Sequence, residues 1–297
     1  MNSAAVPDSV KAAVPDSVKR IIHAGTRSVG RITAGARMLP SFLICGGQRC
    51  GTTSLYKALA QNPAVLKAVL HTGVHYFDIN YHRGTDWYRA HFPLRRHAER
   101  IMEQHGVPGQ TFESSPYYLY HPHAGARIAR DLPGVRLIVL VRDPVERAYS
   151  HHAHEVARGF EMEANFARAL ELETVRLRGQ HARLTADPHA YSFAHQHHAY
   201  RAWGEYATAL QALAHQIGRD QLLVLESEEF FADPKTVYDR VQDFLGLPHL
   251  GYPDFEVHNA RPRTDAMPDE IRAALRAHYE PHDAALTAWV GRTPAWR

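Results

Sequence analysis

A glycine-rich segment early in the chain has the residue types of a phosphate-binding loop. Gly46–Thr53 reads GGQRCGTT and lies between the apolar run Ser41–Gly46 and a helix-like stretch, Thr52–Ala60. Glycines let the backbone turn tightly and point several N–H groups at one place, and a helix N-terminus adds positive potential. Thr52 occupies the position of the lysine in the ATP-binding pattern G-x-x-x-x-G-K-[ST], and the cation comes earlier, at Arg49. The pattern predicts phosphate binding and argues against ATP, although an ordinary tight turn after a strand is the simpler alternative.

A second segment, RDPVERAYS, begins at Arg142 and ends at Ser150. Arg142 follows a second apolar run, Val135–Val141, and Asp143 can cap a helix predicted over 144–158. Ligands of parallel sheets bind outside the carboxyl ends of the strands, and an arginine with a nearby serine suits a phosphate. Taken alone, the segment would equally suit a helix cap with solvated charges. Its coincidence with the first loop favours a second anion site.

The order of the predicted elements indicates an α/β fold. A third strand is expected at Gln221–Glu226, after a helix at Tyr206–Ile217, and another helix starts at Asp233-Pro234 and ends near Gly246. Alternating strands and helices are typical of a central parallel sheet flanked by helices, here a three-layer fold of the P-loop type. We expect one domain over residues 40–297, preceded by a basic leader over residues 1–39.

The leader contains a tandem duplication of AAVPDSVK, followed by a segment with basic and no acidic residues. Two interpretations compete: a basic amphipathic helix that touches an anionic membrane surface, and a frayed leader packed loosely on the domain. Glycines at intervals of five weaken a helix there and favour the second. The basic residues are Lys19, Arg20, Arg27, Arg31 and Arg37.

Composition limits the class of protein. The chain has 297 residues, 45% of them hydrophobic and 22% charged, which is typical of an ordinary globular protein. A net charge of +3 does not indicate a nucleic-acid partner. The two cysteines, Cys45 and Cys50, flank a loop and do not suggest a disulfide framework, so we expect a reducing, cytoplasmic location. No apolar run reaches the length of a membrane span, and no signal peptide is evident.

Histidines are numerous, at 22, and cluster twice. The motif HExxH and a zinc-type pair of thiolates are both absent from the sequence, so no metal site is predicted. The clusters comprise His151, His152 and His154, and His195, His197 and His198.

Both anion segments resemble motifs of one enzyme family. PSFLICGGQRCGTTSLYKAL resembles the 5′-phosphosulfate loop of the heparan-sulfate and related carbohydrate sulfotransferases, and VRLIVLVRDPVERAYSHH resembles their 3′-phosphate motif. VHYFDINYHRGTDWYRAHFP, ESSPYYLYHP and FLGLP are also similar, so the likeness covers about residues 40–297. It implies the donor 3′-phosphoadenylyl sulfate (PAPS) and transfer of a sulfuryl group to a hydroxyl or amine of a carbohydrate-type or hydroxylated small molecule.

The resemblance also implies roles for single residues. Arg49 would contact the phosphosulfate bridge, Gly51 to Thr53 would cradle the 5′-phosphate, and Arg142 with Ser150 would hold the 3′-phosphate. HNARPRTDAM resembles a late loop of the family that covers the nucleotide. The complete cofactor-binding set is Gly47, Gln48, Arg49, Cys50, Gly51, Thr52, Thr53, Ser54, Arg142, Ser150, Arg261 and Arg263.

The chain departs from the family at one position with chemical consequences. Many relatives carry Lys-Glu just before the VHYF segment, and that glutamate is taken as the catalytic base; here the residues are Thr72 and Gly73. Either a histidine, His75 or His71, takes its place, or Glu113 points into the same cleft, or the chain is a weakened relative. We predict His75 as the base, with Arg49 and Glu113 as the other catalytic candidates.

The acceptor side is less specific. Aromatic and basic residues from Tyr76 to His91, with Tyr117, Tyr118 and Tyr120, would line a sugar-sized cleft, or else they are core residues at helical spacing. Two other functions compete with sulfuryl transfer. One is a P-loop kinase or other nucleotide phosphotransferase, which the missing lysine disfavours. The other is a nucleotide-binding relative with weak or no catalysis, which Gly73 suggests.

Overall fold

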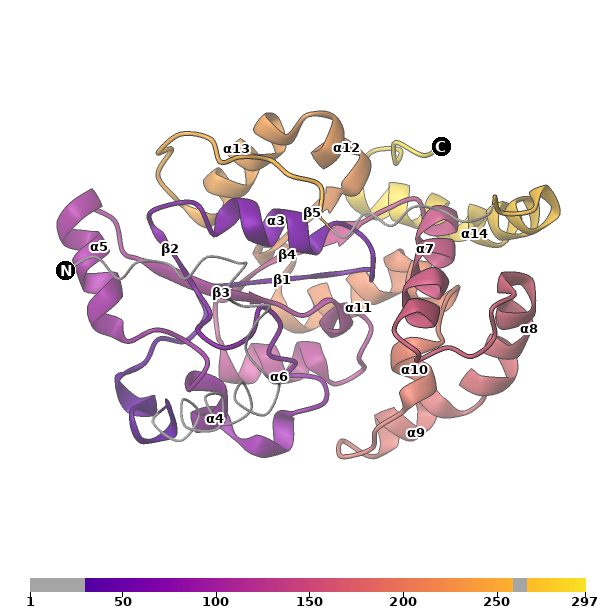
Figure 1. Cartoon of the computed structure of the whole chain (residues 1–297), viewed down its shortest axis with the longest axis horizontal. Coiled ribbons are helices and arrows are strands. Elements are labelled where there is room, and N and C mark those ends of the chain that lie inside the picture. The colour runs from indigo at the N-terminus through magenta and orange to yellow at the C-terminus, as the bar shows by residue number, and fades with distance from the viewer. Residues whose placement is uncertain (1–29, 259–265) are drawn as a thin grey trace.

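The chain folds around a five-stranded sheet. A computed structural model describes residues 30–258 and 266–297. Every strand pairs with its neighbours in parallel, in the order β2-β3-β1-β4-β5, and helices cover both faces (Figure 1). The predicted fold class, a three-layer α/β fold with a central parallel sheet, is therefore confirmed. The strands are β1 (Phe42–Gly46), β2 (Val65–Lys67), β3 (Gln110–Ser114), β4 (Arg136–Val141) and β5 (Leu222–Glu226).

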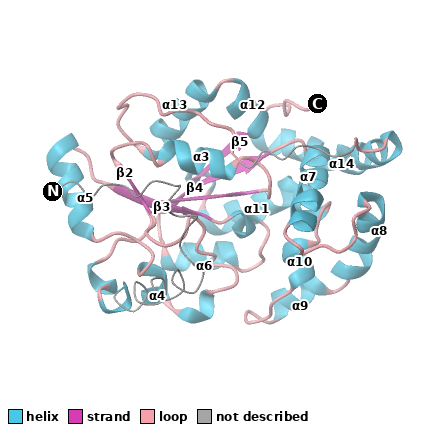
Figure 2. Cartoon of the chain, in the orientation of Figure 1, coloured by secondary structure: helices cyan, strands magenta, loops and turns pink. Residues whose placement is uncertain are grey.

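Helices form the outer layers and a separate group beside the sheet (Figure 2). One face is covered by α3 (Thr52–Leu59), α12 (Ser227–Ala232) and α13 (Pro234–Leu245), and the other by α6 (Ala124–Asp131) and α11 (Tyr206–Ile217). The remaining α-helices are α4 (Thr85–Arg89), α5 (Arg95–His105), α7 (Pro144–Ala157), α8 (Phe166–Leu177), α9 (Gln180–Ala186), α10 (Phe193–His197) and α14 (Asp269–Val290). Short 3₁₀ turns are η1 (Ala34–Ala36), η2 (Tyr81–Arg83), η3 (Pro116–Leu119), η4 (Ala202–Gly204) and η5 (Arg219–Gln221).

β1 and residues 137–141 of its neighbour β4 are apolar because both of their faces are covered. In β1, Phe42 and Ile44 pack with side chains of α3 and α13, whereas Leu43 and Cys45 pack with side chains of α6 and α11. Successive side chains of a strand point to opposite faces, so a run without polar residues belongs in the middle of a three-layer fold.

Several predicted elements match the structure within a residue or two. The strands expected at Ser41–Gly46, Val135–Val141 and Gln221–Glu226 are β1, β4 and β5, and the helix expected at Tyr206–Ile217 is α11. The sequence did not reveal β2 and β3. The first has three residues and the second reads QTFES, so neither shows a recognisable apolar run.

The N-terminal part of the described chain packs on the domain. Ala34 and Met38 are buried, the Met38 amide donates to the Pro93 carbonyl at 2.9 Å, and the Arg37 guanidinium donates to the Phe92 carbonyl at 2.6 Å. The duplicated and basic residues up to position 29 lie outside the described residues, so membrane contact through the leader stays a prediction. No helix in the described ranges has the length and apolar character needed to cross a bilayer.

Candidate active site

The two predicted anion segments lie at the carboxyl ends of neighbouring strands. β1 pairs with β4, with Gly46 opposite Leu140, and the Gly47 amide donates to the Leu140 carbonyl at 3.0 Å. The loop after β1 leads into α3, and the segment after β4 leads into α7. Parallel pairing therefore brings the two loops together at the edge of the sheet where α/β proteins bind ligands.

Three glycines are required for the shape of the first loop. Gly46 has a φ of 136°, and a Cβ there would lie 2.1 Å from the Leu140 carbonyl oxygen. A Cβ at Gly47 would lie 2.7 Å from the Cys50 sulfur, and Gly51, the N-cap of α3, has a φ of 82°. A side chain at any of these positions would displace the loop. The glycines thus let the loop backbone lie close to β4. Because they have no side chains, they do not cover the N-terminus of α3.

Arg49, Arg142 and Ser150 meet at this point. The Arg49 Nε donates to the Ser150 Oγ at 3.1 Å, and an Arg142 Nη donates to the Arg49 carbonyl at 3.2 Å. All three are partly exposed, so a ligand can reach them. Two guanidinium groups, a hydroxyl and the N-terminus of α3 form a donor set that suits a nucleotide with two separate phosphate groups. The residues present therefore fit the donor that the resemblance implies.

Cys50 contributes to the loop through its backbone. Its side chain is fully buried, and burial raises the pKa of the Cys50 thiol to about 11. Its carbonyl accepts a hydrogen bond from the Ser227 hydroxyl at 2.7 Å, and Ser227 also donates to the Val141 carbonyl at 3.0 Å. Ser227 thus links both anion loops from behind, which the sequence did not reveal.

The remaining predicted loop residues have different environments. The Gln48 side chain donates to the Glu155 carboxylate at 2.9 Å, which ties the loop to α7. Thr52 is buried and Thr53 partly exposed, both in the first turn of α3. Buried Ser54 accepts a hydrogen bond from the His258 amide at 3.0 Å. His258 is the last described residue before the gap, and Arg261 and Arg263 lie outside the described residues, so their predicted role stays a prediction.

A buried cation that sequence reasoning missed lies beneath the loop. Arg147 is fully buried, and a Cβ on Gly47 would lie 2.9 Å from its Cδ. Burial alone lowers the pKa of the Arg147 guanidinium, but the neighbouring Tyr206, Tyr279 and Cys50 outweigh burial and raise it. Its positive charge adds to the potential that attracts anions to the loop. In the sequence, the one signal for Arg147 was its position in the segment RDPVER, one helical turn after Asp143.

His75 is held in an unusual backbone conformation. In the described part of the chain, Arg49 (φ 75°) and His75 (φ 53°) are the two non-glycine residues with positive φ. Such strain persists only where the surrounding structure enforces it, and it concentrates at functional sites. At His75 the enforcing contacts include a hydrogen bond from its amide to the Ser115 hydroxyl at 3.0 Å.

The His75 ring pairs with a buried carboxylate. Its Nδ1 lies 2.7 Å from an Asp78 oxygen, and the side chain is 32% exposed against 0% for Asp78. Burial alone would lower the pKa of His75, but the charge and hydrogen bond of Asp78, with the charge of Glu113, raise it. With Nδ1 on Asp78, the Nε2 atom is the one left to exchange a proton with a substrate. His71, the alternative base, is exposed, with its ring 6.0 Å from that of His91.

Glu113 lies behind His75 and not beside it. Its carboxylate is fully buried and accepts hydrogen bonds from the Val74 amide at 2.8 Å and from the hydroxyls of Ser115 and Tyr118, both at 2.6 Å. The Tyr88 hydroxyl donates a further hydrogen bond at 3.0 Å. Burial raises the pKa of Glu113, whereas the hydrogen bonds counteract part of that shift. This environment suits a residue that positions the His75 loop, and does not suit a base that contacts the acceptor.

The predicted aromatic cleft is largely core. Trp87, Tyr88 and Phe92 are 8%, 1% and 0% exposed and belong to the same apolar cluster as Tyr76. Tyr120 differs, because it is partly exposed and its ring stacks on His195 with centroids 4.3 Å apart. Most of these rings are therefore core residues.

The histidine clusters form internal contacts. His151 is fully buried, and burial with the nearby Arg147 charge holds its pKa well below the usual range. Burial also lowers the pKa of His195 to about 3, and its Nδ1 lies 2.8 Å from the Tyr117 hydroxyl. His197 bonds through Nδ1 to the Glu155 carboxylate at 2.9 Å. These three histidines therefore belong to the packed interior of the domain.

Comparison with known proteins identifies the family. Residues 39–259 match the family described as "Sulfotransferase domain". The chain belongs to this sulfotransferase family. The family takes its sulfuryl group from PAPS, so the predicted enzyme class and donor are confirmed, and the matched residues include both anion loops and the His75 segment.

Named relatives of this sulfotransferase act on heparan sulfate. The chain is 32% identical over 227 residues to human bifunctional heparan sulfate N-deacetylase/N-sulfotransferase 3, with 72% of this chain and 23% of the relative covered. It is 29% identical over 223 residues to mouse heparan sulfate glucosamine 3-O-sulfotransferase 3B1, with 73% and 48% covered. The alignments thus cover about a quarter of the first relative and about half of the second.

A solved structure shares the fold over nearly its whole length. The sulfotransferase from Alicyclobacillus acidocaldarius superposes with a TM-score of 0.65 at 27% identity, covering 87% of this chain and 98% of that one. The five-stranded parallel sheet and its flanking helices are therefore those of a sulfotransferase.

Proposed function

We propose that this chain transfers a sulfuryl group from PAPS to a hydroxyl, or an amine, of a carbohydrate-type or hydroxylated small-molecule acceptor. The observation that carries the proposal is the junction of Arg49, Arg142 and Ser150 at the N-terminus of α3. It joins the loop expected to hold the 5′-phosphosulfate to the one expected to hold the 3′-phosphate. A site for a nucleoside triphosphate has no need of a second anion site beside the loop.

The residues divide the work of the reaction. When bound, PAPS supplies the sulfuryl group, with 3′-phosphoadenosine 5′-phosphate as the leaving group. Arg49 and the loop N–H groups stabilise the negative charge that develops on the leaving oxygen, and Arg142 with Ser150 anchors the 3′-phosphate. His75 accepts the proton of the acceptor at Nε2, while Asp78 fixes the ring through Nδ1 and stabilises the protonated form.

The relatives support a carbohydrate acceptor. Both named groups act on heparan sulfate, one as N-sulfotransferases and one as glucosamine 3-O-sulfotransferases, which matches an amine or a hydroxyl as the receiving group. Cys45 and Cys50 are buried and free, which supports the further proposal of a reducing, cytoplasmic location.

Calorimetry tests the donor site directly. We expect binding of 3′-phosphoadenosine 5′-phosphate and much weaker binding of ATP, because Thr52 replaces the lysine that reaches the β and γ phosphates. Tight binding of ATP without binding of the bisphosphate would overturn the proposal in favour of a phosphotransferase. Transfer of radiolabelled sulfate from PAPS to a panel of sugars and hydroxylated metabolites then identifies the acceptor. Binding of the bisphosphate without any transfer would instead indicate a non-catalytic relative.

A further inference from the structure

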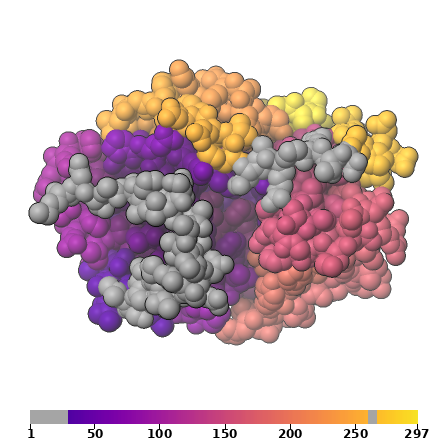
Figure 3. Space-filling view, in the orientation of Figure 1, coloured from indigo at the N-terminus to yellow at the C-terminus, as the bar shows by residue number. Residues whose placement is uncertain are grey.

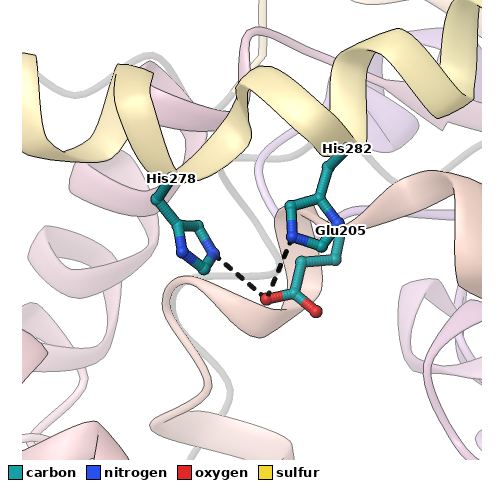
Figure 4. Close-up of side chains that lie close together, drawn as sticks. All are labelled: Glu205, His278 and His282. Atoms are coloured by element: carbon teal, nitrogen blue, oxygen red, sulfur yellow. Dashed lines mark hydrogen bonds and ion pairs between the residues drawn. The ribbon is translucent and has the colours of Figure 1, made fainter.

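A cluster of metal-ligand residues lies outside the donor and proton-transfer site. His278 and His282 project from α14 toward Glu205, which lies at the junction of η4 and α11 (Figure 4). In residues 30–258 and 266–297, it is the group of three metal-ligand side chains whose donor atoms all lie within 4.8 Å of one another. Glu205 is 73 residues from His278 in sequence, which explains why no sequence motif reveals the group.

We propose that Glu205, His278 and His282 bind a zinc ion that joins α14 to the start of α11. The His278 Nε2 lies 3.1 Å from a Glu205 carboxylate oxygen, and the His282 Nε2 lies 4.0 Å from the same oxygen. Zinc–nitrogen and zinc–oxygen bonds are about 2.0–2.2 Å, so two ligands of a tetrahedral ion lie about 3.3 Å apart. Adjustments of about an ångström in side-chain position would bring the three donors to that spacing.

The backbone already fixes both sides of the site. Positions four apart on a helix share one face, so the two imidazoles point the same way. Each is followed by a buried residue, and the first of these, Tyr279, ties α14 to the segment that precedes Glu205. Tyr279 donates to the Arg201 carbonyl at 3.0 Å, and Asp283 accepts from the Arg297 Nε at 2.6 Å. Binding an ion therefore requires little ordering of the backbone.

The donor types favour zinc over the abundant hard cations. Two imidazole nitrogens and one carboxylate suit zinc, whereas magnesium and calcium prefer oxygen ligands. Glu205, His278 and His282 are 33%, 34% and 28% exposed, so an ion can enter from solvent and keep a water as fourth ligand. The simpler alternative is a hydrogen-bonded histidine–glutamate contact between two helices, and it predicts no response to zinc.

The position suggests a structural role. A Cβ on Gly204, next to Glu205, would lie 2.8 Å from Tyr279 and 2.9 Å from Pro144, the first residue of α7. Arg272 of α14 pairs with Glu146 in the first turn of α7. A zinc ion here would hold α14 against the elements that carry the 3′-phosphate motif, and so stabilise the fold.

Zinc titration of the full-length, tag-free protein after dialysis against a chelator tests the proposal. We expect one tight equivalent by calorimetry and a rise in melting temperature with zinc but not with magnesium. At a free zinc concentration 100 times the Kd, the ratio of folded to unfolded protein rises about 100-fold. The double substitution H278Q/H282Q should weaken binding at least about tenfold and abolish the thermal response.

A matched control separates this site from the many other histidines. The double substitution H105Q/H189Q removes two exposed histidines elsewhere and should leave the tight equivalent unchanged. Glu205→Gln, which keeps the side-chain shape, provides a second test should H278Q/H282Q fail to fold, and it should also bind zinc more weakly. Absence of a tight equivalent in the wild type would overturn the proposal. So would wild-type affinity in either site variant.

Discussion

Replacing Glu113 by alanine separates the two roles that this residue could have. As a base, its loss would slow turnover and leave the fold intact. As the acceptor of four buried hydrogen bonds, its loss would destabilise the fold. The structure indicates the second outcome, because the carboxylate is fully buried behind His75.

The loss of stability in Glu113→Ala comes from the hydrogen-bond donors that lose their acceptor. The Val74 amide cannot turn away, whereas the hydroxyls of Ser115, Tyr118 and Tyr88 can reorient to different extents. Leaving a buried donor unpaired costs about 1–3 kcal/mol. If about two of these donors stay unpaired, their cost and that of the cavity left by the side chain together lower the free energy of unfolding by roughly 3–5 kcal/mol. For a chain of this size, that corresponds to a fall in melting temperature of about 6–15 °C.

Thermal and urea unfolding of wild type, Glu113→Ala and Glu113→Gln measure this cost. Glutamine keeps one acceptor oxygen and should lose less stability. Since burial raises the pKa of Glu113, its ionisation costs more in the folded than in the unfolded chain. The wild type should therefore lose stability relative to Glu113→Gln as pH rises through that pKa. A melting temperature within about 2 °C of wild type for Glu113→Ala, together with lost turnover, would refute the structural role and favour Glu113 as the base.

Four further outcomes are expected. His75→Ala should lower kcat by about 10²–10⁴-fold without changing bisphosphate affinity in calorimetry; unchanged turnover would exclude His75 as the base. Asp78→Asn removes a group that raises the pKa of His75, so the acid limb of the pH–rate profile should move to lower pH. Ser150→Ala should weaken bisphosphate binding about fivefold to tenfold, measured by calorimetry, because it removes one hydrogen bond. Gly73→Ala should lower stability by about 1–3 kcal/mol in urea unfolding, since its Cβ would lie 2.6 Å from the Ser114 carbonyl oxygen.

The central part of the fold could be predicted because its signals are local. β1, β4 and β5 are apolar runs, and α7 and α13 begin at Asp-Pro pairs whose aspartates accept hydrogen bonds from the backbone of the first turn. β2 and β3 carry no such signal because they are short or polar. They are strands only because the neighbouring chain supplies their backbone partners, a tertiary effect that propensity does not contain.

The residues of the candidate donor site could be predicted for the same reason, whereas the environment of Glu113 could not. Arg49, Arg142 and Ser150 each stand in a short motif next to a strand end, and parallel pairing then brings them together. The cage around Glu113 joins residues from separate segments, and its burial could not be read from TFESSPYY. The sequence therefore predicted which two loops lie together, whereas the environment of each carboxylate required the packed structure.

Gly73 and Glu113 are two aspects of one local arrangement. The Ser114 amide donates to the Thr72 carbonyl at 2.7 Å, and the Val74 amide donates to Glu113, so the loop lies directly on β3. This contact leaves no room for a Cβ at Gly73. A glutamate at position 73 would have to displace the backbone of β3. The shape of the loop therefore excludes the carboxylate that many relatives carry at this position. The next residue, His75, donates its amide to the Ser115 hydroxyl at 3.0 Å and has a positive φ, with its ring on Asp78. The position of the His75 ring and the exclusion of a glutamate at position 73 therefore depend on the same packed segment, which supports the proposal that His75 is the base.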